Sequence, residues 1–281
     1  MFLFVGGIRK LRSFSTAAAQ PYLLVREREV TVKSSSERVV TLNLLDPCKL
    51  ETVKIPGKTL PTEVAKSLRI GSSKGWVALR DLQNSKLRLT NLFNPCASSP
   101  ITITLAPVDG CYRGSVARVY NVSLSASPNQ RDCVVAAKLF APVVSLCRPG
   151  DSEWTHIETP NHFFTSAVMH SMRDQKFYLH SPDTAPTDLI KTCSGFMVFK
   201  QDHGKKLCSY TQDIGDLCIF LGKNESFCVS ATKYPGLVPN SVYFEGILNG
   251  FGFYELSSNT VHDLTHLAPF STFYLWLAPL E

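Results

Sequence analysis

Short runs of apolar and β-branched residues, separated by turn residues, recur along the chain from residue 38 onward. Between Ile101 and Leu105, isoleucine and leucine alternate with threonine, which places the apolar side chains on one face, as a half-buried strand requires. Gly, Pro, Asn and Asp bound most of the other runs, and these residues favour turns. The pattern predicts strands at residues 38–44, 76–79, 86–93, 101–105, 117–124, 133–140, 176–179, 196–200, 217–221, 227–231, 241–244 and 251–256.

Patterns with the period of a helix are scarce. The clearest one covers Thr62–Arg69, which Pro61 opens and Gly71 ends after about two turns. The sequence therefore predicts an all-β chain with one short helix near residues 61–69.

Many short, evenly spaced strands are typical of a sandwich, a barrel or a propeller. A turn that leads into an aromatic strand recurs at Gly75-Trp76, Asp174–Tyr178 and Asn249–Tyr254, although this repetition alone does not separate a propeller from a sandwich. A propeller blade takes about 40–45 residues, so the roughly 260 residues after the N-terminal segment would form about five or six blades.

The composition is that of an ordinary globular protein. The chain has 281 residues, 44% of them hydrophobic, and a mean hydropathy of +0.01, so it can bury a substantial core. Its longest apolar runs, such as Leu217–Leu221, are far shorter than the roughly 18 residues of a membrane-spanning helix, so we expect no membrane span. Nine cysteines occur without a C-x-x-C pair, which argues for reduced thiols in the core and against a structural zinc site.

The first twenty residues have the composition of a targeting peptide. The basic residues Arg9, Lys10 and Arg12 stand among Ser, Thr and Ala, and the first acidic residue is Glu27. The run Arg-Ser-Phe-Ser that begins at Arg12 resembles a mitochondrial processing pattern, with the cut after Phe14. We therefore expect a mitochondrial targeting peptide at residues 1–20 and a folded domain at residues 21–281.

A chloroplast transit peptide and a secretory signal are the alternatives. A chloroplast peptide is usually longer and richer in Ser, and the charges of a secretory signal precede its apolar run, whereas here they follow Phe2–Ile8. If the protein is not secreted, the sequons at Asn121 and Asn224 carry no sugar.

The N-terminal segment also supplies half of the excess positive charge. The net charge of +6 falls to +3 without the three basic residues of that segment. No later stretch combines a basic cluster with interleaved aromatic residues, so we expect no nucleic-acid partner.

Distinctive motifs recur between Ile70 and Phe244, and the resemblance that rests on them extends over most of residues 40–281. They are Ile70–Trp76, Phe93–Pro95, Asp132–Val135, Leu146–Asp151 with Trp154, Arg173–Asp174 with Phe177–Tyr178, Phe196–Lys200, Tyr210–Gly222, Ser226–Ser230 and Tyr234–Phe244. Together these motifs resemble a plant-specific family, the F-box-associated β-propeller of the KIB type, and the run from Asp213 to Phe244 is the most specific part.

The resemblance implies a β-propeller in which the motif residues have a structural or an interaction role. Two departures stand out: Lys74 occupies a position where relatives often have His, and the stretch between Lys176 and Phe196 is shorter than in relatives by roughly one to two blades. The second departure implies a shortened or incomplete ring. The motif residues are Gly75, Trp76, Arg148, Gly150, Asp151, Trp154, Asp213, Gly215, Asp216, Gly222, Pro235, Gly236, Tyr243 and Phe244.

Within that family, the chain resembles the organellar group, which carries a targeting peptide and lacks an F-box. The segment Leu60–Leu68 is superficially similar to the opening of an F-box, but an F-box needs about three helices, and here the strand at Trp76 follows at once. We therefore expect no binding to a ubiquitin-ligase adaptor.

Three local patterns could carry chemistry. The pair in His262-Asp-Leu-Thr-His266 has the spacing of a zinc-protease helix but follows a turn, so a strand or loop is expected there. Asp213-Ile-Gly-Asp216 favours a turn over a calcium or acid–base site. Gly71-Ser-Ser-Lys-Gly75 fits the letters of a nucleophile elbow centred on Ser73, but the helix precedes the motif instead of following it.

The chain is therefore expected to be a non-enzymatic protein-interaction domain of mitochondria, with no catalytic residue, no cofactor, no metal and an unknown protein partner. Loops on a rigid ring commonly bind proteins, and the tryptophans at 76, 154 and 276 are expected to pin blades together in the core. The alternatives are a substrate-recognition propeller related to F-box ubiquitin-ligase subunits that acts outside the organelle, a loop-borne metal or enzyme site at His262 and His266, and a family member without a stable fold.

Overall fold

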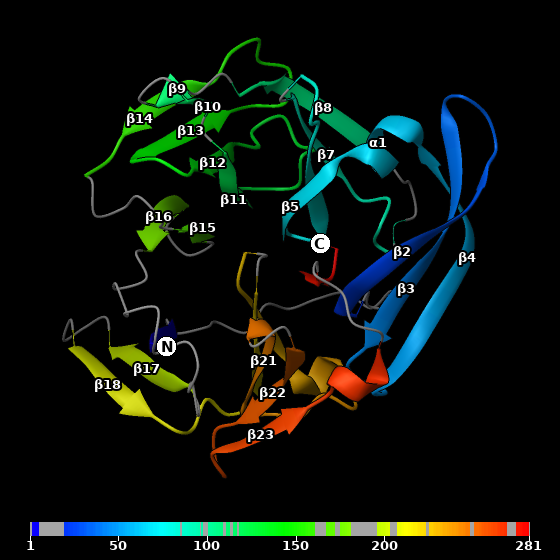
Figure 1. The fold of residues 1–281 in the computed structure, drawn as a ribbon. Coiled ribbons are helices and arrows are strands. Elements are labelled where there is room, and N and C mark those ends of the chain that lie inside the picture. Colours follow the sequence, from blue (N-terminus) through cyan, green and yellow to red (C-terminus); the bar gives the residue numbers. More distant parts are fainter. Residues whose placement is uncertain are drawn as a thin grey trace.

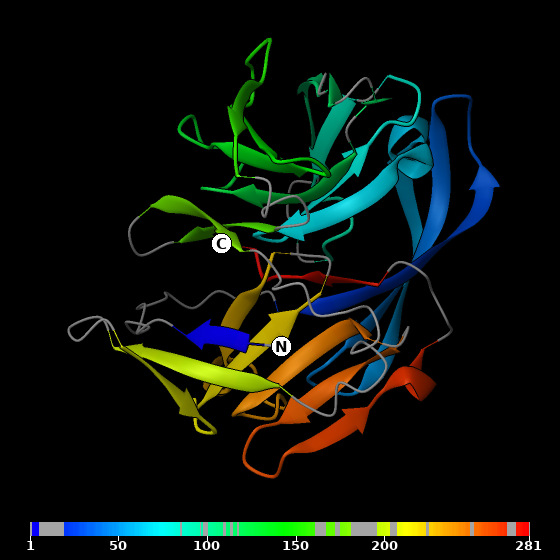
Figure 2. The same cartoon turned by 60° about the vertical axis from the view of Figure 1, so that its left-hand side comes forward.

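Strands make up most of the structure, a computed structural model, and they form sheets arranged around a common centre (Figure 1, and turned in Figure 2). The prediction of an all-β, propeller-like fold is confirmed. The structure describes residues 2–5, 20–84, 86–95, 97, 101–108, 111–112, 115–116, 118–160, 167–171, 175–180, 196–202, 207–222, 225–247, 250–268 and 274–280.

The first complete blade joins the two ends of the folded chain. Its strands lie in the order β24-β2-β3-β4, each antiparallel to its neighbours. Leu23 lies opposite Trp276 and Leu24 opposite Leu275, so the C-terminal strand closes the ring as the innermost strand of the first blade. The strands are β2 (Tyr22–Val32), β3 (Glu37–Asp46), β4 (Glu51–Pro61) and β24 (Leu275–Leu277).

The next two blades are four-stranded antiparallel sheets in which consecutive strands are neighbours. The second blade contains β5 (Leu68–Ser73), β6 (Trp76–Arg80), β7 (Lys86–Thr90) and β8 (Thr102–Pro107). The third contains β11 (Val119–Leu124), β12 (Val135–Leu139), β13 (Val143–Cys147) and β14 (Thr155–Glu158).

A five-stranded blade with the order β20-β19-β21-β22-β23 completes the larger sheets. The pair β19–β21 is parallel and the other pairs are antiparallel. Every residue of β19 is apolar, as expected for a strand that is covered on both faces. The elements are β19 (Leu217–Leu221), β20 (Phe227–Ser230), β21 (Ser241–Ile247), β22 (Gly250–Glu255), β23 (Thr260–Asp263) and the short 3-10 helices η3 (Ala231–Lys233) and η4 (Thr265–Leu267).

Two smaller sheets lie in the sector between β11–β14 and the five-stranded blade (Figure 1). Among the described residues the ring thus has four complete blades, fewer than the five or six expected from chain length. The smaller sheets are β15 (Ala167–Ser171) with β16 (Lys176–His180), and β1 (Phe2–Val5) with β17 (Met197–Asp202) and β18 (Leu207–Thr211); a third short pair is β9 (Cys111–Tyr112) with β10 (Ser115–Val116).

The apolar core lies between neighbouring sheets. Leu89 of the second blade and Val135 of the third belong to one buried cluster, which also contains Trp76 and Trp154. Trp276 is fully buried in the cluster between the first blade and the five-stranded blade. All three tryptophans therefore pack between blades, as predicted.

The helix is shorter than predicted. Helix α1 (Thr62–Lys66) ends after five residues because Leu68–Ser73 continues as the innermost strand of the second blade. Gly71, which was expected to end the helix, is buried in that strand. No helix in the described part of the chain is long and apolar enough to cross a membrane.

Candidate functional site at the centre of the ring

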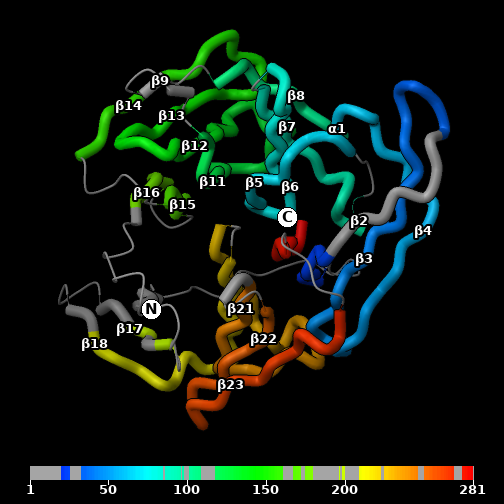
Figure 3. The backbone as a smooth tube through the Cα atoms, viewed as in Figure 1, coloured from blue at the N-terminus to red at the C-terminus, as the bar shows by residue number. Residues whose placement is uncertain are grey.

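The inner strands β24, β5, β11 and β15 lie side by side near the centre (Figure 3). They belong to different sheets and share no ladder, so the backbone groups on their facing edges need partners other than a neighbouring strand. The Ser72 hydroxyl of β5 donates to the Trp276 carbonyl oxygen of β24 at 2.5 Å. The Asn121 side-chain oxygen of β11 accepts the Val168 N–H of β15 at 2.8 Å. Buried polar side chains thus join neighbouring blades.

Glu225, between β19 and β20, fastens three of these strands to the five-stranded blade. Its Oε1 accepts hydrogen bonds from the Ser123 hydroxyl (2.6 Å) and the His170 backbone N–H (2.7 Å), and its Oε2 accepts one from the Ser73 hydroxyl. Its own N–H donates to the Ser72 carbonyl oxygen at 2.7 Å. One acidic residue therefore connects β5, β11 and β15.

The surroundings raise the pKa of the Glu225 carboxyl above its ordinary value. Burial is the largest cause, although part of the residue's surface remains accessible. The hydrogen bonds from His170, Ser123 and Ser73, and the positive charge of Lys74, lower the pKa because they stabilise the carboxylate, but they do not outweigh the burial. The hydrogen bonds thus hold the carboxylate in place, although they do not fully offset the free-energy cost of desolvating its charge.

The geometry gives Ser73 a structural role. Its hydroxyl donates to Glu225 and accepts the Leu124 N–H at 3.0 Å, and the residue is only 4% exposed. A nucleophile must reach its substrate, and this hydroxyl is covered. Ser73 ends strand β5 and leads into β6, so the strand-to-helix turn of a nucleophile elbow is not formed, as its sequence context predicts.

The β5–β6 hairpin explains the residues of the Gly-Ser-Ser-Lys-Gly-Trp motif. Lys74 (φ 49°) and Gly75 (φ 79°) both adopt the left-handed conformation that a two-residue type I′ turn requires, and Ser73 pairs with Trp76 across it. A Cβ added at Gly75 would lie 2.8 Å from the Ala278 carbonyl oxygen. The glycine therefore permits both the turn and the close approach of the C-terminal segment.

The Cys-Arg-Pro-Gly-Asp motif, Cys147–Asp151, forms a turn. The Asp151 N–H donates to the Arg148 carbonyl oxygen at 3.0 Å, Gly150 has φ 101°, and the Arg148 N–H donates to the Asp151 carboxylate at 2.8 Å. Arg148 thus contacts Asp151 through its backbone N–H. Nearby, the Trp154 indole N–H donates to the Ala106 carbonyl oxygen at 2.8 Å and ties the third blade to the second.

The two carboxylates of the Asp-Ile-Gly-Asp motif also serve a turn, as predicted. Asp213 accepts the N–H of Gly215, which has φ 70°, at 2.8 Å. Asp216 accepts hydrogen bonds from the hydroxyls of Ser230 and Thr232. Both carboxylates are bonded within the chain at the start of β19.

The Tyr-Pro-Gly-Leu motif forms a turn against the first blade. The Leu237 N–H donates to the Tyr234 carbonyl oxygen at 3.1 Å, with Pro235 and Gly236 between them. A Cβ added at Gly236 (φ 103°) would lie 1.9 Å from the Cys48 carbonyl oxygen. The turn therefore depends on glycine for its conformation and for its contact with the β3–β4 connection.

The remaining motif residues pack in or beside the core of the five-stranded blade. A Cβ added at Gly222 would lie 2.3 Å from the Glu245 carboxylate. The Tyr243 ring stacks on Phe220 with centroids 4.8 Å apart, and Phe244 is buried. The structure thus places the family-motif residues in turns and between blades.

The family model for the KIB1-4 β-propeller matches residues 42–189 and 184–263, well over half of the chain. The chain belongs to this family. The two matched segments meet at residues 184–189, inside the stretch between Lys176 and Phe196 where the sequence resemblance implies a shortening. The comparison with curated proteins found no match.

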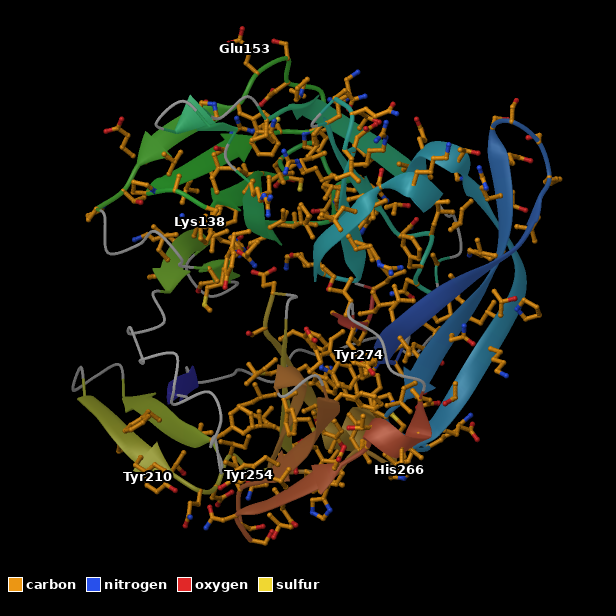
Figure 4. All side chains as sticks on the ribbon, in the orientation of Figure 1. Lys138, Glu153, Tyr210, Tyr254, His266 and Tyr274 are labelled. Atoms are coloured by element: carbon orange, nitrogen blue, oxygen red, sulfur yellow. The ribbon has the colours of Figure 1, made fainter. Side chains whose placement is uncertain are left out.

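In this KIB1-4 β-propeller, the two histidines suspected of binding metal do not share a helix face. His262 lies on β23, where its ring stacks on Phe253 at 4.3 Å and its Nε2 lies 3.7 Å from the Glu255 carboxylate. His266 lies on the short helix η4 (Figure 4). Within the described part of the chain, no group of three or more His, Cys, Asp or Glu residues could hold a metal ion.

The cysteines whose side chains the structure describes are free thiols, as predicted: Cys48, Cys133, Cys147, Cys218 and Cys228. Burial raises the pKa of Cys218 to about 12 and that of Cys48 to about 11. A high pKa leaves little thiolate at neutral pH, so these thiols are weak nucleophiles.

Lys138 on β12 is a buried cation that sequence analysis missed. It is fully buried, and its Nζ donates to the Leu139 carbonyl oxygen at 2.5 Å and to that of Ala141. Burial lowers its pKa to about 8. The lysine belongs to the third blade, close to the sheet of β15 and β16 (Figure 4).

Sequence analysis also missed Glu225, Ser123 and His170 as one group. Ser123 lies 102 residues and His170 lies 55 residues before Glu225 along the chain. Glu225 is the middle residue of the sequon that begins at Asn224, and nothing in that local sequence indicates a buried carboxylate. Among the groups that bond to Glu225, the sequence singles out only Ser73, because Gly71 and Gly75 flank it.

The raised pKa of Glu225 predicts a pH-dependent stability. A group whose pKa is raised by folding stabilises the fold below its ordinary pKa of 4.5, and this contribution is lost as the pH rises through the raised value. Glutamine cannot ionise, so the stability of Glu225→Gln should not show this loss. As the pH rises from acid to neutral, the difference in free energy of unfolding should therefore shift in favour of the variant. Denaturant unfolding of both proteins across this range measures the difference. Glu153→Gln, at an exposed position, is the matched control, and a difference that stays constant with pH for Glu225→Gln would contradict the prediction.

The close approach at Gly75 predicts a crowding effect that can be separated from the conformational one. Gly75→Ala should destabilise the fold by more than about 1 kcal/mol, because the methyl group meets both an unfavourable φ and the Ala278 carbonyl. Gly57→Ala is the control, since Gly57 has φ 69° but no atom within 4 Å of the added Cβ. Urea unfolding should show the larger loss at Gly75; equal losses would show that the C-terminal segment does not pack there.

Proposed function

We propose that this KIB1-4 β-propeller is a non-enzymatic protein-interaction domain that is imported into mitochondria. The observation that carries the interaction role is a set of exposed apolar side chains on the two small sheets. Met169 and Tyr178 lie opposite each other on β15 and β16 and are 36% and 47% exposed. Tyr210 on β18 is 50% exposed and contacts Phe199 of β17, with ring centroids 6.0 Å apart (Figure 4). We call these four residues, of which Phe199 is half-buried, the apolar sector.

Tyrosine and methionine are enriched at protein interfaces because they offer a large apolar contact area, and tyrosine adds a hydrogen-bonding group. Most other large apolar residues of the ring are buried between blades. The central polar residues bond to one another and hold the inner strands together, which supports a scaffold role for the centre and a binding role for the apolar sector.

Import into mitochondria is supported by the composition of residues 1–20. Arg9, Lys10 and Arg12 lie outside the described residues, so the support comes from the sequence alone. The segment that resembles the opening of an F-box, Leu60–Leu68, forms the end of β4, the five-residue helix α1 and the start of β5, so coupling to a ubiquitin-ligase adaptor is not part of the proposal.

The test is microscopy of the full chain with a C-terminal fluorescent tag, beside a version without residues 1–20. We expect only the full chain to enter mitochondria, because the basic segment at residues 1–20 is the targeting signal. If both versions remain in the cytosol or nucleus, the import proposal is wrong, and a substrate-recognition role outside the organelle takes its place.

Proximity labelling then tests the interaction role. A labelling enzyme fused to the full chain should mark a set of proteins that is lost in the Tyr178→Ser, Tyr210→Ser double variant. The matched control is Leu82→Ser, Val261→Ser, which removes two exposed apolar side chains elsewhere on the ring. Loss of the same proteins in both variants, or in neither, would contradict the assignment of binding to the apolar sector.

A further inference from the structure

The two small sheets each bury one face and expose the other. Val168 of β15 packs against Ala136 and Val144 of the third blade. Val198 of β17 packs against Ile219 and its neighbours in the five-stranded blade. Since successive residues of a strand point to opposite faces, the apolar sector lies on the other side of both sheets.

The edge of β17 is occupied by a strand from the start of the chain. Phe2–Val5 pairs with β17 in parallel, from Phe2 opposite Met197 to Val5 opposite Lys200. Strand β18 pairs with the other edge of β17 in the usual antiparallel manner. The N-terminal strand is therefore the third strand of a sheet that has only two strands from the ring itself.

Loss of the N-terminal strand would leave this edge of β17 without a neighbouring strand. The processing pattern places a cut after Phe14, which would remove Phe2–Val5 from the protein. The backbone N–H and C=O groups on that edge of β17 would then lose their ladder, and such an edge readily takes up another extended chain. The strand that the edge holds before processing shows what fits: an extended, wholly apolar segment of four residues in parallel register.

We propose that the β17 edge is a strand-acceptor site. It holds Phe2–Val5 before N-terminal processing and takes an extended apolar segment of a partner protein afterwards, with backbone hydrogen bonds supplying affinity and the alternate side chains supplying selectivity. Phe199 and Tyr210, which lie on the outer face of the same sheet, give such a partner further apolar surface. The processing step rests on the proposed import, whereas the acceptor edge itself does not.

Hydrogen exchange of the purified full chain tests the acceptor edge. Successive N–H groups of a strand point to opposite edges, so one of any two neighbouring residues donates to β17. The variant Leu3→Pro, Phe4→Pro removes both donors and therefore blocks pairing of the N-terminal strand whichever of the two faces β17. The amides of residues 197–200 that face the N-terminal strand should exchange roughly tenfold faster or more in this variant, while those that face β18 stay protected. Ala17→Pro, Ala18→Pro is the matched control, and the amides of β21 and β22 report any general loss of structure.

A synthetic peptide of residues 1–12 is used in a second experiment on the acceptor edge. Added to the Leu3→Pro, Phe4→Pro variant, it should restore protection at residues 197–200, and the same peptide with both prolines should not. Unchanged exchange in the proline variant, or failure of the peptide to protect these amides, would overturn the proposal. Neither result depends on where the protein resides, so failure here leaves the microscopy result standing, and a cytosolic location leaves this one standing.

Discussion

Neighbouring inner strands of this ring share no backbone ladder, and the structure depends on how their polar groups are bonded instead. Ser72 bonds β5 to β24, Asn121 bonds β11 to β15, and Glu225 bonds three inner strands to the five-stranded blade. Each of these contacts links residues far apart in sequence, so each holds one blade against another. The apolar clusters between blades supply most of the packing, but they are non-directional, and the polar contacts fix how the inner strands lie against one another.

A carboxylate suits the central position for a chemical reason. Two hydroxyls and one backbone N–H converge on Glu225, and an ionised carboxylate offers acceptor sites to all three without presenting a competing donor. Charge-assisted hydrogen bonds are stronger than neutral ones, which offsets part of the desolvation that raises the pKa. The same balance makes this site sensitive to its protonation state, whereas the motif turns at Arg148–Asp151 and Asp213–Asp216 rest on local backbone geometry.

Local patterns predicted the strands and turns well because they depend on nearby residues. The apolar run 217–221 coincides with β19, and the Lys74-Gly75 turn lies where a hairpin sequence indicates it. The helix at Thr62 was predicted too long, since the place of Leu68–Ser73 in the ring outweighs its local helical pattern. The closing pair β2–β24 and the partners of Glu225 could not be predicted, because contacts between residues that lie 55 to more than 200 positions apart leave no local trace in the sequence.

The sector of the two small sheets follows the same packing rule as the complete blades. A two-stranded sheet is marginal alone, and here each small sheet is stabilised by burying one face, through Val168 or Val198, against a complete blade. In a full ring the opposite face would be buried against the next blade as well. Each small sheet therefore exposes apolar side chains on its other face, and the sheet of β17 also has the edge that pairs with the N-terminal strand. On this view the apolar sector and the β17 edge have one physical origin: each small sheet packs against a complete blade on one face only.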